Sequence, residues 1–289
     1  MTPKTNNERD PVLKNLDPHQ YQETARAFFK TNAITLSPSK GLSLIGEILE
    51  AFSVIPYENL SKIIKYENAH QDAASIRLPD EVWEDFRTHR LGGTCFSLTF
   101  LLQSIVVAAG FRCYPVMARM KVGENRHSAV VVEIDGDFYL LDPGYVLDIP
   151  IQILDEKRLF YKAGHAGVEL RKSDVISHYH LFTFNKNGSQ WRYEFENRAV
   201  DTHHFFQYWM GSFQWNGMNG LCLTRAHQDK LVYIHKYFMR ETGLQGKKNF
   251  NLKKNREEVI QSAFGIAPEI VEAAEAAIQG RRQRSKRTE

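Results

Sequence analysis

The sequence predicts an α+β protein in which helices come first, antiparallel strands follow and a mixed region ends the chain. Three observations support this prediction. Apolar residues recur at helical spacing through roughly the first ninety residues, whereas residues 112–141 and 180–195 alternate as strands do around tight-turn dipeptides. After residue 201 both patterns are mixed. A chain of 289 residues suits one large domain, or two to three small ones that share a core.

The composition excludes several classes of protein. With 43% hydrophobic and 25% charged residues, the chain is typical of a globular protein and not of a disordered one. It contains no run of eighteen apolar residues, so no membrane span or membrane partner is predicted, and its first seven residues lack the apolar stretch of a secretory signal. Three cysteines are too few, and odd in number, for a disulfide framework, so we expect a cytoplasmic location.

Four helices are predicted in the first part of the chain. Asp17 is a good N-cap and Pro18 a good first-turn residue, so the first helix opens there. The fourth is strongly apolar throughout, and Gly110 is placed to stop it. The predicted helices cover residues 17–29, 42–52, a segment from residue 79 through 86, and 96–109.

The middle of the chain predicts a small barrel or a strongly curved sheet. Residues 112–122 and 128–141 are rich in Val, Ile, Tyr and Phe, and Asp135-Gly136 divides the second segment into a hairpin. Residues 180–195 repeat this design around Asn187-Gly188. Four or more antiparallel strands in sequence are typical of such curved sheets.

The last part of the chain predicts two short helices, near residues 255–264 and 268–278, and a basic tail. The whole chain has a net charge of +3, but the tail of residues 281–289 alone carries +4, which leaves residues 1–280 at −1. A body this close to neutral does not have the electrostatic footprint of a nucleic-acid partner. We interpret the tail as a frayed, solvated terminus.

Cys95 is the first candidate for chemistry. It begins the apolar helix, where unpaired backbone N–H groups and the helix dipole favour a thiolate. Gly92 and Gly93 allow a sharp bend and the close approach of a ligand. From this segment alone, a buried structural cysteine is an equally good interpretation. Cys113 and Cys222 have apolar or strand-like neighbours and are interpreted as structural.

A thiolate nucleophile needs a base, and the base needs an orienting group. His127 begins a strand after a polar loop, and Asp142 follows the return strand of the same hairpin. A turn at Asp135-Gly136 therefore brings His127 and Asp142 together. We expect the carboxylate to bind the imidazole at Nδ1 and to stabilise its charged form. Each residue alone would be an ordinary surface histidine or turn aspartate, but together with Cys95 they predict a catalytic triad.

These residues and their surroundings resemble the arylamine N-acetyltransferase family. The matching segments, which span about residues 17–266, are Ile55–Leu60, Gly92–Phe96, the helix that ends at Phe111, the His127 strand, Tyr139–Tyr145 and Asn255–Ile266. The resemblance implies a thiol-protease-like core with its triad at Cys95, His127 and Asp142. It also implies a helical bundle (1–90), a catalytic helix start with a β-barrel (91–200), and an α/β lid with the basic tail (201–289).

The resemblance also implies the reaction. A member of this family moves an acetyl group from acetyl-CoA, its cosubstrate, through a cysteine thioester to an arylamine in a ping-pong sequence, as in xenobiotic metabolism. Its partners are thus an acyl-CoA and a small-molecule amine, with Phe213 matching a segment near the acceptor pocket. No metal is predicted, because the pairs His178/His180 and His203/His204 lack companion ligands. The oligomeric state stays open.

The chain departs from the family pattern around the triad. Leu91 stands where members usually carry Arg directly before Gly-Gly, and Ser97 and Thr99 replace the usual Glu and Asn. Val146 replaces the second glycine of the usual Asp-Val-Gly-Phe-Gly. None of these changes removes a triad residue. Two alternatives therefore stay open: a transglutaminase-like or hydrolytic cysteine enzyme, and a family-derived protein whose activity has diverged or been lost.

Overall fold

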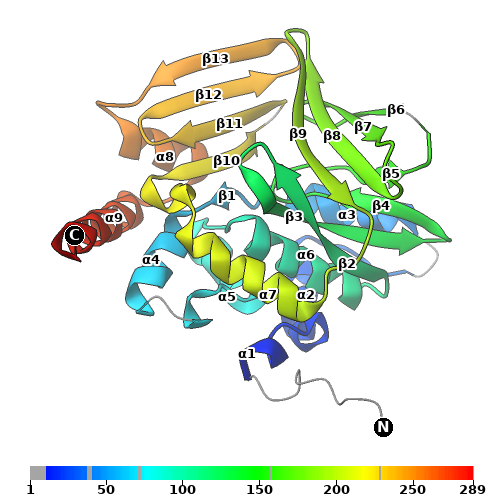
Figure 1. The fold of residues 1–289 in the computed structure, drawn as a ribbon, viewed down its shortest axis with the longest axis horizontal. Coiled ribbons are helices and arrows are strands. Elements are labelled where there is room, and N and C mark those ends of the chain that lie inside the picture. The colour runs from blue at the N-terminus through cyan, green and yellow to red at the C-terminus, as the bar shows by residue number, and fades with distance from the viewer. Residues whose placement is uncertain (1–10, 38–40, 71–72, 157, 228, 289) are drawn as a thin grey trace.

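The computed structural model describes residues 11–288 except 38–40, 71–72, 157 and 228. A helical region underlies two antiparallel sheets, one of eight strands that nearly closes into a barrel and one of five strands covered by the last helices (Figure 1). This architecture confirms the predicted α+β class.

The helical region begins as the sequence predicts. The Asp17 carboxylate accepts a hydrogen bond from the His19 N–H and caps the first turn. The four predicted helices all form, whereas α4 was not predicted, because only Leu60, Ile63 and Tyr66 mark its buried apolar face. The elements are α1 (Pro11–Lys14), η2 (Pro18–Tyr21), α2 (Gln22–Thr31), α3 (Leu42–Phe52), α4 (Leu60–Asn68), η4 (Ala73–Ser75), α5 (Pro79–His89) and α6 (Cys95–Ala108).

Helix α6 occupies the centre of the molecule. Every residue from Cys95 to Val106 is buried, because α2, α3 and α5 contact the helix and strands β2 and β3 of the barrel contact it as well. A helix that is apolar on all sides is stable only in such surroundings. Gly110, with φ of +93°, follows the helix in the left-handed conformation that glycine tolerates best. The first residue of α6 is thus held firmly, and that residue is Cys95.

The barrel is built from the predicted hairpins. Asp135 and Gly136 both have positive φ, as a type I′ turn requires, and the register pairs Val130 with Leu141. In the second hairpin the turn is Lys186-Asn187, one residue earlier than predicted. The strand order is β5-β4-β3-β2-β9-β8-β7-β6. The strands are β2 (Arg112–Met120), β3 (Gly123–Ile134), β4 (Asp137–Leu141), β5 (Ile151–Ile153), β6 (Arg158–Lys162), β7 (Gly167–Lys172), β8 (His178–Asn185) and β9 (Gly188–Glu196).

The second sheet pairs strands that lie far apart in the sequence. Strand β1, Tyr57–Glu58, lies in the helical region by sequence but pairs with β10, so that Tyr57 lies opposite Thr224. The sheet packs through Leu223 and Ile234 on the last helices. The remaining elements are α7 (Thr202–Gly211), η5 (Ser212–Gln214), η6 (Asn216–Asn219), β10 (Cys222–His227), β11 (Lys230–His235), β12 (Phe238–Gly243), β13 (Gly246–Asn251), α8 (Arg256–Phe264) and α9 (Pro268–Thr288).

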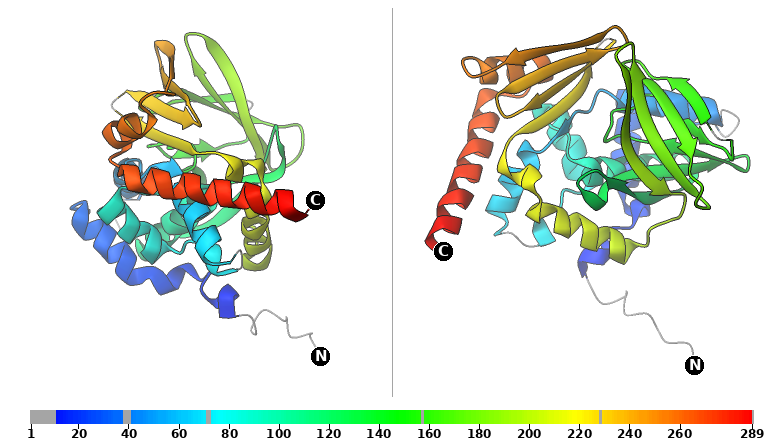
Figure 2. Two further views of the ribbon diagram at one scale, coloured as in Figure 1. Left: turned by 90° about the vertical axis from the view of Figure 1, so that its left-hand side faces the viewer. Right: turned by 45° about the horizontal axis from the view of Figure 1, so that its top comes forward.

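Helix α9 corrects one expectation. It continues far beyond residue 278 and includes most of the basic segment, so the prediction of a frayed tail is wrong (Figure 2). Arg281 donates a hydrogen bond to the carbonyl of Met218 at 3.3 Å, and Arg282 donates to that of Asn219 at 2.9 Å. Arg, Gln and Lys are good helix formers and no proline follows, so nothing in this segment ends the helix. Within the described part of the chain, no helix is both long and apolar enough to span a bilayer.

Candidate active site

The loop before Cys95 is held against β1 and the segment that precedes it. The carbonyl oxygen of Gly93 accepts a hydrogen bond from the N–H of Glu58 at 3.0 Å. A Cβ atom on Gly92 would lie only 1.9 Å from the carbonyl oxygen of Pro56, so the backbone there leaves room for glycine alone. The loop therefore delivers Cys95 to the start of α6 in one fixed position.

His127 and Asp142 lie side by side, as the hairpin geometry predicts. The Nε2 atom of His127 is 3.1 Å and 3.0 Å from the two carboxylate oxygens of Asp142. The expectation that the carboxylate binds Nδ1 is therefore wrong. A Cβ atom built on Gly144 would lie 2.7 Å from Cε1 of His127 and 3.1 Å from Cβ of Cys95. The Nδ1 edge of the ring thus faces α6, which leaves Nδ1 for the hydrogen bond with Cys95.

Asp142 is completely buried and fully hydrogen-bonded. Besides His127, its carboxylate accepts the backbone N–H of Tyr145 at 3.0 Å and the hydroxyl of Tyr193 at 2.5 Å. The rings of both tyrosines also contact the imidazole, with centroids 5.1 Å and 4.7 Å away. Sequence reasoning missed Tyr193, because no local pattern connects β9 with the end of β4. The carboxylate can therefore fix the imidazole without moving.

The three side chains stabilise each other's charges. Burial alone would lower the pKa of His127, but the charge of Asp142, its hydrogen bond and the contact with Cys95 raise that pKa to about 10. Burial works against a thiolate at Cys95, but the hydrogen bond and charge of His127 outweigh it and lower the thiol pKa. Burial raises the pKa of Cys113 and of Cys222 to about 12. Among the three cysteines, only Cys95 is set up as a thiolate.

Lys62 is a second cation near the sulfur that the sequence analysis did not identify. Its ammonium group is buried in α4, donates to the carbonyl oxygen and hydroxyl of Ser212 at 3.1 Å and 2.5 Å, and lies 4.5 Å from the ring centroid of Phe213. Burial lowers the pKa of Lys62 to about 7, and the charge of Cys95 opposes this shift. The signal for it was a lysine among the apolar residues of α4, but α4 itself was not predicted. Its positive charge further lowers the thiol pKa of Cys95.

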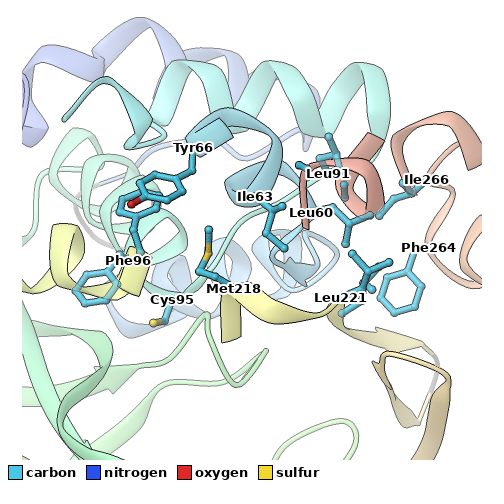
Figure 3. Packing of buried hydrophobic residues seen from close by; sticks show 14 of the residues in the cluster. Leu60, Ile63, Tyr66, Leu91, Cys95, Phe96, Met218, Leu221, Phe264 and Ile266 are labelled. Atoms are coloured by element: carbon cyan, nitrogen blue, oxygen red, sulfur yellow. The ribbon is translucent and has the colours of Figure 1, made fainter. Parts of the chain in front are cut away.

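Phe213 lies inside the core and not on an open wall. Its side chain is 1% exposed and stacks on Tyr66, with the ring centroids 4.7 Å apart. It belongs to the same apolar cluster as Cys95, which lies at the border of that cluster with Phe96 and Met218 nearby (Figure 3). The structure therefore places Phe213 in the packing that supports the cysteine, and its role in binding an acceptor stays a prediction.

Two of the departures from the family pattern have visible consequences. Thr99 donates a hydrogen bond to the carbonyl of Ser128 at 3.0 Å and so connects α6 to the strand that carries His127. Val146 has φ of +54°, a left-handed conformation that glycine adopts easily and a β-branched residue does not. The turn after Asp142 therefore keeps a backbone shape that normally calls for glycine.

The paired histidines have ordinary partners. Nδ1 of His180 accepts from the indole of Trp191 at 3.2 Å, and Nδ1 of His204 lies 2.6 Å from the Asp201 carboxylate. His178 contacts the carbonyl of Ile176, and His203 the side chain of Gln207. No group of three or more potential metal ligands occurs among the residues that the structure describes.

Comparisons with known proteins agree with this geometry. A family model described as N-acetyltransferase matches residues 43–272. No curated protein sequence matches the chain. Three similar solved structures are the arylamine N-acetyltransferases of Mycobacterium abscessus, Nocardia farcinica and Salmonella typhimurium. The M. abscessus enzyme has a TM-score of 0.74 and 16% identity, and the match covers 94% of this chain and 99% of that enzyme. The N. farcinica enzyme has a TM-score of 0.73 and 17% identity, with coverage of 91% and 99%. The S. typhimurium enzyme has a TM-score of 0.67 and 18% identity, with coverage of 88% and 98%. At such identities the structural likeness shows the fold.

Proposed function

Because the chain belongs to the arylamine N-acetyltransferase family, we propose that it transfers an acetyl group from acetyl-CoA to an arylamine through a thioester on Cys95. The chain is thereby an acetyltransferase, and the proposal concerns its donor, its acceptor and its route. The observation that supports the route is the buried set of Cys95, His127 and Asp142, in which the thiol pKa is lowered and the imidazole pKa is raised. A thiolate beside an imidazolium is the reactive form of a cysteine nucleophile.

In the first half of the proposed reaction, the Cys95 thiolate attacks the thioester carbonyl of acetyl-CoA. Backbone N–H groups at the start of α6 would stabilise the oxyanion, a role that contributes about 3 kcal/mol in other enzymes. The carbon–sulfur bond to CoA then breaks, and the imidazolium of His127 protonates the departing CoA thiolate. The products are free CoA, an acetylated Cys95 and a neutral imidazole.

In the second half, the arylamine attacks the acetyl group on Cys95. Nδ1 of His127, now neutral, takes the proton that the amine loses, and Asp142 stabilises the imidazolium through Nε2. The bond between the acetyl carbon and the Cys95 sulfur breaks and restores the thiolate. The enzyme is thereby returned to its starting charge state, with the acetyl group on the amine.

Intact mass measurement tests this proposal directly. Incubation of the pure protein with acetyl-CoA alone should add one acetyl group, and addition of an aniline derivative should remove it. The Cys95→Ala variant should gain nothing. Steady-state rates should give parallel lines in double-reciprocal plots, as expected for exchange through a covalent intermediate. Loss of the acetyl group to water as fast as to the amine would instead identify a hydrolase, and a folded His127→Gln variant with near wild-type turnover would show that the base is wrong.

A further inference from the structure

Arg77, between η4 and α5, has no place in the mechanism and is only 2% exposed. Its guanidinium donates to the carbonyl oxygen of Gly92, to the hydroxyl of Ser61 at 2.7 Å and to the carboxylate of Asp85 at 2.5 Å. Burying an arginine is costly unless its donors are satisfied, so these partners must be in place in the folded protein. The contact with Gly92 is the one that concerns Cys95, because it lies in the loop that leads to α6.

The same guanidinium organises a buried carboxylate. Glu58 is fully buried, lies 3.8 Å from Nη1 of Arg77 and accepts the N–H and the hydroxyl of Ser61 at 2.9 Å and 2.5 Å. Glu81 lies 3.5 Å from Nε. Only the planar fork of an arginine can reach several acceptors in different directions at once, whereas a lysine presents a single point charge.

The contacts of Arg77 and Glu58 hold successive carbonyl groups of the loop. Arg77 binds the carbonyl of Gly92, and the backbone N–H of Glu58 binds that of Gly93. Tyr57 and Gly93 also form a parallel bridge. Because Arg77 also lies 3.8 Å from the Glu58 carboxylate, it contacts residues at both attachments of the loop. A shift of this loop would move Cys95 away from His127.

Leu91 explains why a contact from elsewhere in the chain matters for this loop. The resemblance leads one to expect an arginine there, directly before the two glycines, but Leu91 is apolar and 5% exposed. A cavity of about 510 Å³ behind the loop is lined by Leu91 and by Arg77, Glu81 and Asp85, among others. The guanidinium that the loop contacts thus comes from a segment fourteen residues earlier in the chain.

We infer that Arg77 is a positioning residue for Cys95, which it serves by holding the carbonyl of Gly92 and thereby the start of α6 where the sulfur meets His127. The inference rests on the proposed role of Cys95 in acyl transfer. Loss of the arginine would weaken the contact between thiolate and imidazolium. The reactivity of the thiol should then fall at neutral pH even where the fold survives.

The test compares the Arg77→Lys and Arg77→Met variants with a matched control, Lys65→Met. Lys65 forms an ion pair with Glu81 and donates to the carbonyl of Ile76 at 2.8 Å, so it belongs to the same cluster, but it does not contact the loop. The measurement is the rate of Cys95 alkylation by iodoacetamide against pH, followed by peptide mass spectrometry with Cys113 as the reference. Both Arg77 variants should raise the apparent thiol pKa and slow alkylation at pH 7 by about tenfold, the effect of one pKa unit. Lys65→Met should lower the melting temperature without moving the pH profile.

Two results would overturn the inference: a wild-type pH profile in folded Arg77→Lys protein, or an equal shift in Lys65→Met. If Arg77→Met does not fold by circular dichroism, Arg77→Lys decides, because it keeps a cation beside Glu58. Alkylation needs no acyl transfer, so the two proposals can fail separately. A wild-type protein that alkylates rapidly but gains no acetyl group from acetyl-CoA contradicts the proposed function and leaves the effect of Arg77 on the thiol intact.

Discussion

At the scale of single residues, the three cysteines differ in the charges around each sulfur. Cys95 has a lowered thiol pKa, whereas those of Cys113 and Cys222 are raised to about 12. Limiting iodoacetamide at pH 7 should therefore modify Cys95 first, because the thiolate is the reactive form. Peptide mapping by mass spectrometry measures the order, and acetyl-CoA should protect Cys95. Equal modification of all three cysteines would contradict the triad.

Position 144 needs a glycine because the side chains of His127 and Cys95 lie close to it, and not because its backbone has a positive φ. A methyl group there would lie 2.7 Å from Cε1 of His127 and 3.1 Å from Cβ of Cys95, so one of the two side chains must move. We expect Gly144→Ala to keep the fold and to reduce kcat/KM by about 10²-fold, the effect of a displacement near 1 Å at a reacting group. The comparison is with Gly46→Ala, where a methyl group meets no atom within 4 Å and activity should not change. Wild-type activity in Gly144→Ala would show that the triad tolerates displacement.

His127 makes stability depend on pH. Its pKa rises from the ordinary 6.5 to about 10 in the folded protein, so folding favours the protonated form. This stabilisation is complete below about pH 6.5 and is lost as the pH rises through about 10. Because Cys95 titrates together with His127, the test uses a Cys95→Ala background: the difference in free energy of unfolding between Cys95→Ala and Cys95→Ala/His127→Gln should shrink as the pH rises above about 6.5. Urea denaturation at several pH values measures it, and a constant difference would show that folding does not raise the pKa of His127.

At the scale of elements, short sequence patterns predicted the helices and hairpins that interactions within a short segment stabilise. The apolar spacing of residues 42–52 predicted α3 with its observed bounds, and Asp135-Gly136 predicted the hairpin that brings His127 to Asp142. Strand β1 was not predicted, because its two residues pair with β10, far along the chain. The length of α9 was missed because the basic segment was interpreted as a frayed end, although its residues are good helix formers, and because the contacts of Arg281 and Arg282 with η6 lie far away in the sequence.

The end of α9, residues 281–289, contributes measurably to the stability of the fold. Deletion of residues 281–289 removes the hydrogen bonds to the carbonyls of Met218 and Asn219. The melting temperature should fall by about 4–8 °C, because the two bonds contribute about 1 kcal/mol each and each kcal/mol corresponds to about 2–4 °C. Differential scanning calorimetry measures the shift.

Glu67→Gln serves as the control for this deletion. It breaks only the ion pair with Arg284, whose side chain is half exposed, and such pairs contribute little. Its melting temperature should therefore stay close to that of the wild type. If the truncated protein were as stable as the wild type, residues 281–289 would be a solvated tail that does not stabilise the fold.

At the scale of the whole molecule, the site combines residues that sequence reasoning could and could not connect. Cys95, His127 and Asp142 were predicted because each lies in a short pattern and one hairpin joins two of them. Tyr193 and Lys62 were not, because their partners Asp142 and Ser212 lie 51 and 150 residues away. The nitrogen that Asp142 binds was also predicted incorrectly, since ring orientation depends on where α6 lies relative to the barrel.

This dependence on distant segments predicts how the chain behaves when it is divided. The apolar cluster beneath Cys95 contains residues from 16–100 and from 205–278, and β1 needs β10 as its partner. A fragment of residues 1–200 would expose that cluster to water. We expect it to lack near-ultraviolet circular dichroism and to bind a hydrophobic dye. Cooperative thermal unfolding of this fragment would show that the C-terminal sheet is dispensable.

The burial of Cys95 has a consequence for the lifetime of the protein. Only 5% of this residue is exposed, so little of the sulfur meets solvent. We expect small electrophiles to modify it faster than bulky ones, because a small reagent needs less opening of the surrounding structure. The thiolate form of cysteine is normally the form most readily modified by oxidants and by mixed-disulfide formation. We therefore expect burial to slow the modification of Cys95 by large thiol reagents, even though its thiol pKa is lowered.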